Sequence, residues 1–215
     1  MARARILVGD DHAILREGLV RLLEPEFDVM GTAGDGQSLV NEAKRIQPDV
    51  VIFDIGMPLL NGIEAASHIR GLAPGAKLVF LTQHSGKEYL VAAFRAGASG
   101  YVLKNSAASE LLEAVREVLA GRCFLSADLR HRFGDLQSAE SGMRADFFGN
   151  ALTSRQRQVL QLIAEGKSAK EIAYILEISP KTVEFHKSAI MDELGIRTTA
   201  ELTRYAIEQG IVSPQ

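Results

Sequence analysis

The chain has 215 residues, of which 47% are hydrophobic and 24% are charged, and this balance excludes the disordered and collagen-like classes. A net charge of -3 at pH 7 means that any contact with nucleic acid must rest on a local basic patch. The single cysteine excludes a disulfide within the chain, and no apolar run reaches the roughly 20 residues that a membrane span needs. We therefore expect a cytoplasmic protein without a signal peptide and without a membrane partner.

Residues 1–121 alternate between short apolar runs and segments with the 3.6-residue spacing of amphipathic helices. The pattern occurs five times, and the apolar runs are Ile6–Val8, Phe27–Thr32, Val50–Phe53, Leu78–Leu81 and Tyr101–Leu103. Because most of these runs are continuously apolar, their strands must be covered on both faces. We predict an α/β domain with a doubly wound, five-stranded parallel sheet of the flavodoxin type.

Polar side chains follow four of the predicted strands at the point where each strand ends. Asp10 and Asp11 follow the first strand and Asp54 the third, while Thr82 and Lys104 stand at the ends of the fourth and fifth. Since the carboxyl ends of parallel strands line the ligand crevice of an open sheet, we expect these five side chains to meet there.

The three carboxylates determine what chemistry this edge can perform. Burying them together without a partner costs on the order of several kcal/mol, so the arrangement calls for a cation, and oxygen ligands favour Mg2+ over zinc. An aspartate beside such a metal can attack a phosphoryl group. Lys104 can pair with that group and the Thr82 hydroxyl can donate a hydrogen bond to it, so the residues predict an aspartyl phosphate.

The rest of the chain divides into a linker and a helical domain. Residues 122–150 lose the periodicity and mix Ser, Gly, Asp and Arg with scattered apolar residues, which indicates a linker. Residues 151–215 contain helical patterns only, and we predict an all-α domain of four helices. The expected helix starts are Thr153, Ser168 in a capping box with Glu171, Ser179 before Pro180, and Thr198 or Thr199 before Glu201.

The second and third of these helices have the proportions of a helix-turn-helix. The apolar residues of the third helix, Val183, Ile190 and Leu194, define its buried side. The opposite side, which we predict enters the major groove of DNA, carries Lys181, Glu184, Phe185 and Ser188.

The first 121 residues resemble the receiver domain of two-component response regulators. The residues that carry the resemblance are Asp10-Asp11, Asp54 followed by Met57-Pro58 and Gly62, Thr82, Tyr101 and Lys104. It implies that Asp54 is the phosphoacceptor and that Asp10, Asp11, Asp54 and the Gly56 carbonyl hold Mg2+. Thr82 and Tyr101 would then form the switch pair, and Lys104 would contact the phosphoryl group.

Two positions depart from the receiver pattern. Asn105 follows Lys104 where the family usually has a proline with a cis peptide bond, and a non-proline cis bond costs about 3 kcal/mol. Gly56, two residues after the phosphoacceptor, places no side chain over the site. We therefore expect easy access of water and a short-lived phosphoryl group.

Residues 152–207 resemble the DNA-binding domain of the LuxR/FixJ-type, or NarL-like, regulators. The resemblance implies DNA contacts by Lys181, Thr182, Glu184, Phe185, Lys187 and Ser188, and a dimer contact by Leu202, Tyr205 and Ala206. Many relatives have a basic residue in place of Glu184, so we predict an unusual or weaker half-site. Residues 151–215 hold eight basic and eight acidic residues, and this balance makes affinity for DNA depend on dimerisation.

Together the two resemblances predict a DNA-binding response regulator. A sensor histidine kinase would phosphorylate Asp54, and the phosphorylated chain would change its domain arrangement, form a homodimer on double-stranded DNA and control transcription. The alternative is a phosphate sink or protein-interaction regulator without sequence-specific DNA binding. The acidic Glu184 on the predicted DNA-binding face and the balanced charge of residues 151–215 favour this alternative. A phosphatase is disfavoured because Gly56 stands where a general acid is needed, so the chain would only slowly hydrolyse its own aspartyl phosphate.

Overall fold

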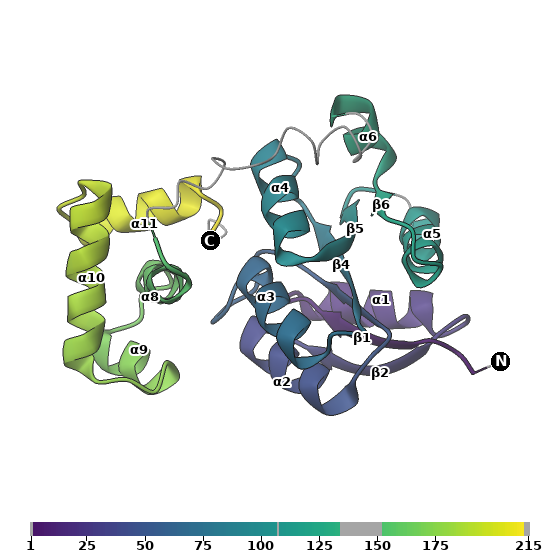
Figure 1. The fold of residues 1–215 in the computed structure, drawn as a ribbon, viewed down its shortest axis with the longest axis horizontal. Coiled ribbons are helices and arrows are strands. Elements are labelled where there is room, and N and C mark those ends of the chain that lie inside the picture. The colour runs from purple at the N-terminus through teal and green to yellow at the C-terminus, as the bar shows by residue number, and fades with distance from the viewer. Residues whose placement is uncertain (1, 107, 134–151, 213–215) are drawn as a thin grey trace.

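The computed structural model describes residues 2–106, 108–133 and 152–212, which form a domain built on a sheet and a domain of helices (Figure 1). The first domain consists of β1 (Arg5–Gly9), α1 (Ala13–Leu23), β2 (Asp28–Ala33), α2 (Gly36–Ile46), β3 (Val50–Phe53), α3 (Gly62–Leu72), β4 (Lys77–Thr82), α4 (Lys87–Ala96), β5 (Ala98–Leu103), α5 (Ala108–Leu119), β6 (Phe124–Leu125) and α6 (Ala127–Phe133). The second consists of α8 (Ser154–Ala164), α9 (Ala169–Ile175), α10 (Pro180–Leu194) and α11 (Thr199–Glu208). None of the helices in these ranges is long and apolar enough to cross a membrane.

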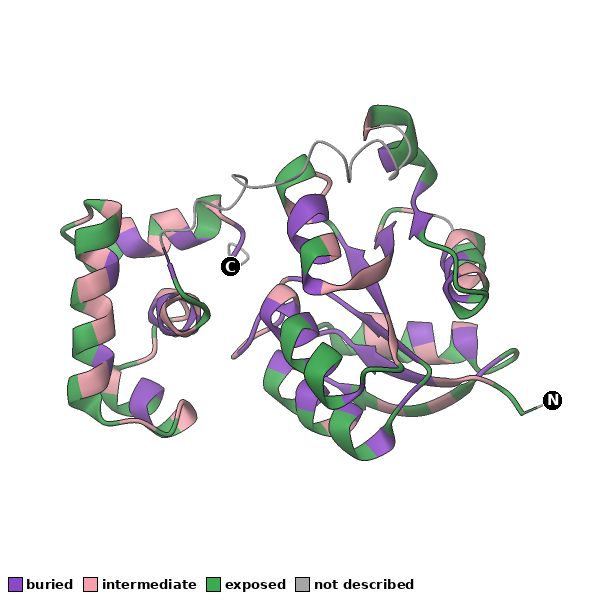
Figure 2. Cartoon of the chain, in the orientation of Figure 1, coloured by how far each residue is buried: buried purple, intermediate pink, exposed green. Residues whose placement is uncertain are grey.

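The sheet is parallel and has the strand order β2-β1-β3-β4-β5-β6. Successive side chains of a strand point to opposite faces, so the buried strands feed two separate cores. One core joins Leu7, Phe53 and Phe80 to helices α2, α3 and α4, and the other joins Val8 and Ile52 to α1 and α5. Figure 2 shows the resulting buried layer between helices, which confirms the doubly wound architecture.

The sheet has one strand more than the sequence predicts. β6 pairs with Gly100 and Tyr101 of β5, and it lies, together with α6, in the segment 122–150 that we predicted as a linker. Leu125 and Leu129 pack into the core of the first domain, so this domain continues past residue 121. A strand of two residues is too short to produce a periodic pattern, which explains why the sequence does not reveal it. The remainder of the predicted linker, 134–150, lies outside the described residues.

The predicted helix starts of the second domain are confirmed. Capping boxes begin α8 at Thr153, α9 at Ser168 and α11 at Thr198, and the Ser179 side chain caps α10 ahead of Pro180. These caps satisfy amide groups that have no partner within the helix. The helices enclose their own core, which includes Val159, Ile172, Val183, Ile190 and Leu202.

Helix α8 of the second domain faces the loop between β3 and α3 of the first, next to α3 (Figure 1). The loop residue Leu59 packs against the core of the helical domain. The loop that follows β3 therefore contacts the helical domain directly.

Candidate functional site

The carboxyl ends of β1, β3 and β5 bring two aspartates and a lysine together in the interior. Asp10 is 1% exposed and Asp54 7% exposed. The Nζ atom of Lys104 lies 2.8 Å from Asp10 Oδ2 and 2.7 Å from Asp54 Oδ2. Burial by itself lowers the pKa of Lys104, but the charges and hydrogen bonds of Asp54 and Asp10 outweigh it and raise the pKa, so the ammonium group stays charged.

Asp11 and His12 extend this cluster toward solvent. Ligand atoms of Asp10, Asp11 and His12 lie within 4.8 Å of one another, and His12 Nδ1 is 2.8 Å from Asp11 Oδ1. The N-cap of α1 is His12, whose side chain makes no cap bond, so neither aspartate caps this helix. Carboxylate oxygens beside the main chain of Gly56 suit a hard divalent cation such as Mg2+. The donor set thus fits the metal that the receiver resemblance implies.

The two predicted switch residues meet at the main chain of His84. The Thr82 hydroxyl oxygen accepts a hydrogen bond from the amide of His84 at 3.3 Å, and the Tyr101 hydroxyl donates to the carbonyl of His84 at 2.7 Å. Thr82 and Tyr101 are fully buried, and burial together with the nearby charge of Asp54 raises the pKa of Tyr101. The His84 ring stacks on Tyr89 of α4 with centroids 4.2 Å apart.

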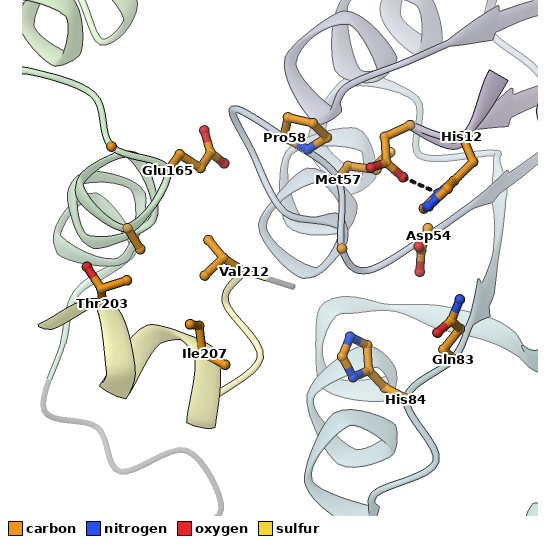
Figure 3. A pocket seen from close by; sticks show the side chains of 14 residues that line it. His12, Asp54, Met57, Pro58, Gln83, His84, Glu165, Thr203, Ile207 and Val212 are labelled. Atoms are coloured by element: carbon orange, nitrogen blue, oxygen red, sulfur yellow. Dashed lines mark ion pairs between the residues drawn. The ribbon is translucent and has the colours of Figure 1, made fainter. Parts of the chain in front are cut away.

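A cavity of about 880 Å3 opens in front of Asp54 between the two domains (Figure 3). Its first wall comes from the sheet domain and includes Asp11, His12, Asp54, Gly56, Met57, Pro58, Gln83 and His84. Its second wall comes from α8 and α11 and the residues after them, and consists of Ala164, Glu165, Gly166, Thr203, Ile207 and Val212. Gln83 and His84 border Asp54 as well, although the sequence analysis did not single them out.

Sequence reasoning missed this second wall entirely. Burial raises the pKa of the Glu165 carboxyl, which faces the cavity, while burial lowers the pKa of His84. The spacing of polar residues along α8 does not indicate that the residues of this wall lie near Asp54. Their proximity arises only from the contact between the two domains.

The peptide bond between Lys104 and Asn105 is trans, as are the other peptide bonds of the described residues. Asn105, which replaces the usual proline, therefore follows an ordinary trans peptide bond.

The predicted DNA-binding face of α10 is open to solvent. Lys181, Glu184, Phe185 and Ser188 are exposed, and the Phe185 side chain is 68% exposed although it is a large apolar group. Thr182 and Lys187 are partly buried, while Val183 and Ile190 face the core. The structure thus separates the two sides of α10 as the sequence predicts.

The predicted dimer contacts on α11 need a correction. Leu202 and Ala206 are fully buried in the core of their own domain, and Tyr205 packs against that core. A side chain enclosed within its own domain is not free to contact a second copy. The other side of α11 carries Thr203 and Ile207, which line the cavity in front of Asp54.

Comparison with known proteins identifies both domains. Residues 6–116 match the response regulator receiver domain, and residues 150–206 match the bacterial regulatory proteins of the LuxR family. Transcriptional regulatory protein MctR of Rhizobium johnstonii is 38% identical over 213 residues, covering 98% of this chain and 96% of the relative. The chain is a DNA-binding response regulator of the LuxR type.

Further relatives and solved structures agree with the regulator's domain order. Oxygen regulatory protein NreC of Staphylococcus aureus is 35% identical, with 97% of the regulator and 99% of the relative covered. The RcsB response regulator of Salmonella typhimurium has a TM-score of 0.66 at 25% identity, covering 97% of the regulator and 99% of that chain. A LuxR-family response regulator from Aurantimonas has a TM-score of 0.60 at 38% identity, covering 64% of the regulator and 99% of that chain.

Proposed function

We propose that a sensor histidine kinase phosphorylates the regulator on Asp54. The observation that carries this proposal is the Lys104 ammonium group held between Asp10 and Asp54 at the carboxyl edge of the sheet. An oxygen of Asp54 forms a bond to phosphorus while the bond from phosphorus to the histidine nitrogen of the kinase breaks, and the electron pair stays on that nitrogen. Lys104 and the Thr82 hydroxyl offset the charge of the transferred group.

Mg2+ would be held by Asp10, Asp11, Asp54 and the Gly56 carbonyl. When bound, the cation neutralises the phosphoryl oxygens and so lowers the barrier to transfer. Asp10 is buried, and its carboxylate already accepts a hydrogen bond from the amide of His12 at 2.9 Å. This bond fixes the orientation of the Asp10 carboxylate in advance.

Substitution of the phosphoacceptor tests the proposal. With acetyl phosphate and Mg2+ as the phosphoryl source, we expect the regulator to gain one phosphoryl group by intact mass and Asp54→Asn to gain none. Asp128→Asn, which alters a side chain 61% exposed on α6, serves as the matched control and should react like the native chain. Equal incorporation by Asp54→Asn would refute the assignment.

The aspartyl phosphate would be lost by slow hydrolysis within the regulator. Gly56 lines the cavity in front of Asp54 and offers no side chain to exclude water from this side. We expect Gly56→Asn to lengthen the lifetime of the aspartyl phosphate several-fold, because the amide side chain would occupy space that the attacking water needs. The decay of phosphorylated protein after removal of the phosphoryl source measures this, and an unchanged rate would contradict it.

Phosphorylation would promote homodimers on double-stranded DNA, with the exposed face of α10 in the major groove. The solved relatives include RcsB bound to a promoter in the presence of a phosphomimetic, and RcsB dimers bound to DNA, which supports the same mode of action for this regulator. A DNA target implies that the regulator works in the cytoplasm. Selection of bound sequences from random DNA, with and without beryllofluoride, tests for a sequence-specific site, and a failure to enrich any sequence would favour the phosphate sink.

A further inference from the structure

The segment that follows α5 completes the edge of the sheet beside Lys104. Phe124 and Leu125 form β6, which pairs in parallel with β5 (Figure 1). Leu125 lies in one core of the sheet domain and Phe124 in the other, so this short strand is packed on both of its faces. The match to the receiver domain covers residues 6–116, and β6 lies beyond it. Residues outside the matched range therefore help to build the edge of the sheet that carries Lys104.

Ser126 takes the next position of this ladder with its side chain instead of its carbonyl group. Its amide donates to the Tyr101 carbonyl at 3.0 Å, as in a parallel ladder that continues. Its carbonyl accepts from the amide of Arg130 at 2.9 Å and so belongs to the first turn of α6. The amide of Leu103, the last residue of β5, donates to the Ser126 hydroxyl oxygen at 3.0 Å. The hydroxyl thus replaces the main-chain acceptor that β5 loses where the chain turns into the helix.

The hydrogen bond between Ser126 and Leu103 is closed to solvent. Ser126 is 0% exposed and Leu103 is 3% exposed. A buried amide that loses its acceptor cannot pair with bulk water, so removal of the hydroxyl leaves the Leu103 amide without a partner unless the main chain shifts. The hydroxyl therefore stabilises one particular position of the end of β5.

The same hydroxyl reaches the far end of the turn that follows β5. The hydroxyl oxygens of Ser126 and Ser106 lie 3.3 Å apart, so one of them donates to the other. The Ser106 amide donates to the Leu103 carbonyl at 2.9 Å and closes the turn 103–106. Lys104 and Asn105 are the central residues of this turn, and neither is a proline whose ring would restrict the main chain. Hydrogen bonds at both ends of the turn, which meet at Ser126, hold its conformation instead.

The main chain around Lys104 is thus held from both sides of β5. The Lys104 amide donates to the Thr82 carbonyl of β4 at 2.9 Å, and the amide one residue earlier donates to Ser126. The Nζ atom lies 2.8 Å from Asp10 and 2.7 Å from Asp54. Because Nζ meets two carboxylates at once, a shift of the main chain that carries it lengthens at least one of these contacts.

From these contacts we propose that Ser126 is a positioning residue for Lys104 in phosphoryl transfer to Asp54. Its hydroxyl holds the end of β5 and the turn after it, and so sets where the ammonium group of Lys104 lies. Lys104 offsets the charge of the transferred group, and such an effect depends on geometry. The role rests on the proposed function, in which Asp54 is the phosphoacceptor. It extends the phosphorylation site to a residue in the segment that the sequence predicts as a linker.

Removal of the hydroxyl tests this role in the full-length chain. With acetyl phosphate and Mg2+ as the phosphoryl source, we expect Ser126→Ala to lower the rate of phosphorylation about tenfold, which corresponds to one hydrogen bond of ordinary net strength. Ser109→Ala makes the same change at an exposed position of α5 and should react like the native chain. Intact mass at successive times measures the rates. A native rate for Ser126→Ala would refute the role.

A second variant separates positioning from the stability of the segment formed by β6 and α6. Leu129 of α6 is fully buried in the core of the sheet domain. Leu129→Ala leaves a cavity there, so it should lower the urea midpoint of unfolding at least as much as Ser126→Ala does. Its phosphorylation rate should stay close to that of the native chain, because the Ser126 hydroxyl is still present. An equal loss of rate in both variants would overturn the role, since packing of the segment would then be sufficient to explain it.

The Lys104 side chain gives a readout that does not require phosphorylation. In protein isotope-labelled at lysine Cε, the NMR resonance of Lys104 is the one that Lys104→Met lacks. We expect Ser126→Ala to move this resonance toward that of an exposed lysine such as Lys44, and Leu129→Ala to leave it in place. An unchanged Lys104 resonance in Ser126→Ala would contradict the positioning of this side chain.

Failure of the positioning role can be told apart from failure of the phosphoacceptor assignment. If the native chain and Ser126→Ala gain a phosphoryl group at the same rate, the positioning role is refuted and the assignment of Asp54 stands. If the native chain gains none, the assignment fails and the role in phosphoryl transfer fails with it. The side-chain resonance then decides whether Ser126 positions Lys104 at all.

Discussion

Lys104 is the residue on which the electrostatics of the site depend. Its side chain is 7% exposed and lies between two carboxylates that would otherwise repel each other across the interior. Its ammonium group lies close to both carboxylates and supplies a positive charge between them. In the proposed function, this side chain from the carboxyl end of β5 prepares the site for phosphoryl transfer.

Lys104→Met should lower the free energy of unfolding by about 3 kcal/mol in metal-free buffer, because it leaves buried carboxylates without their partner. Added Mg2+ should restore part of this loss, since the cation supplies the missing positive charge and binds only the folded site. Urea denaturation with and without Mg2+ measures both effects. Lys44→Met, at an exposed position of α2, is the control, and a loss that Mg2+ does not change would contradict the idea.

Helix α10 has one side that packs in the core of its domain and an opposite side that is exposed to solvent. Ser179 and Pro180 fix its start and Gly195 its end, in a left-handed conformation with a φ of 64°. Val183 and Ile190 attach it to the core, which leaves the opposite side, with Phe185, free for DNA. Because α10 is packed firmly on the core of its domain, its exposed face can fit into the major groove of DNA without a change in the helix.

Lys181→Ala should weaken binding to all DNA sequences to a similar degree. The exposed ammonium group at the start of α10 is placed to neutralise a phosphate, which carries no sequence information. The slope of log affinity against log salt should fall by about one unit per site. A salt titration of the native chain and the variant measures this, with Lys77→Ala in the receiver as control, and an unchanged slope would show that Lys181 touches no phosphate.

At the scale of the whole molecule, the loop between β3 and α3 and the cavity in front of Asp54 both lie where the two domains meet. The same loop carries a proposed metal ligand, Gly56, and the residues that α8 holds, Met57, Leu59 and Asn61. Because the loop is short and anchored at both ends, we expect a chemical change at Asp54 to be coupled to the arrangement of the two domains.

The native regulator should therefore unfold in a single calorimetric transition, because the buried contact couples the stability of the two domains. Gln161→Leu should separate the transition into two, one for each domain. Differential scanning calorimetry measures this, and two resolved transitions in the native chain would show that the contact adds too little free energy to couple them.

The sequence was sufficient for the parts of the regulator that depend on local patterns. Asp10, Asp54 and Lys104 follow the ends of apolar runs. The carboxyl ends of parallel strands lie at the same edge of a sheet, whatever the length and conformation of the connecting loops. The caps of the helical domain were predictable for the same reason, since Ser168 and Glu171 lie three residues apart. β6 was missed because two residues form no pattern, and its pairing depends on Tyr101 being nearby.

One wrong prediction and one omission concern surfaces that only packing can assign. Leu202 and Ala206 have the spacing of one helix face, and a periodic pattern does not tell whether that face meets its own core or a second copy. Gln161 has the polar character of a surface residue and is nevertheless buried between domains.

The sequence by itself therefore determined the two domains, their folds and the residues gathered at the carboxyl edge of the sheet, because strand and helix periodicity act over a few neighbouring residues. Tertiary structure alone decided that Gln161, Glu165 and Arg157 hold the loop beside Asp54. That contact joins residues about a hundred positions apart, and its free energy comes from the burial and pairing of polar groups that no local pattern records.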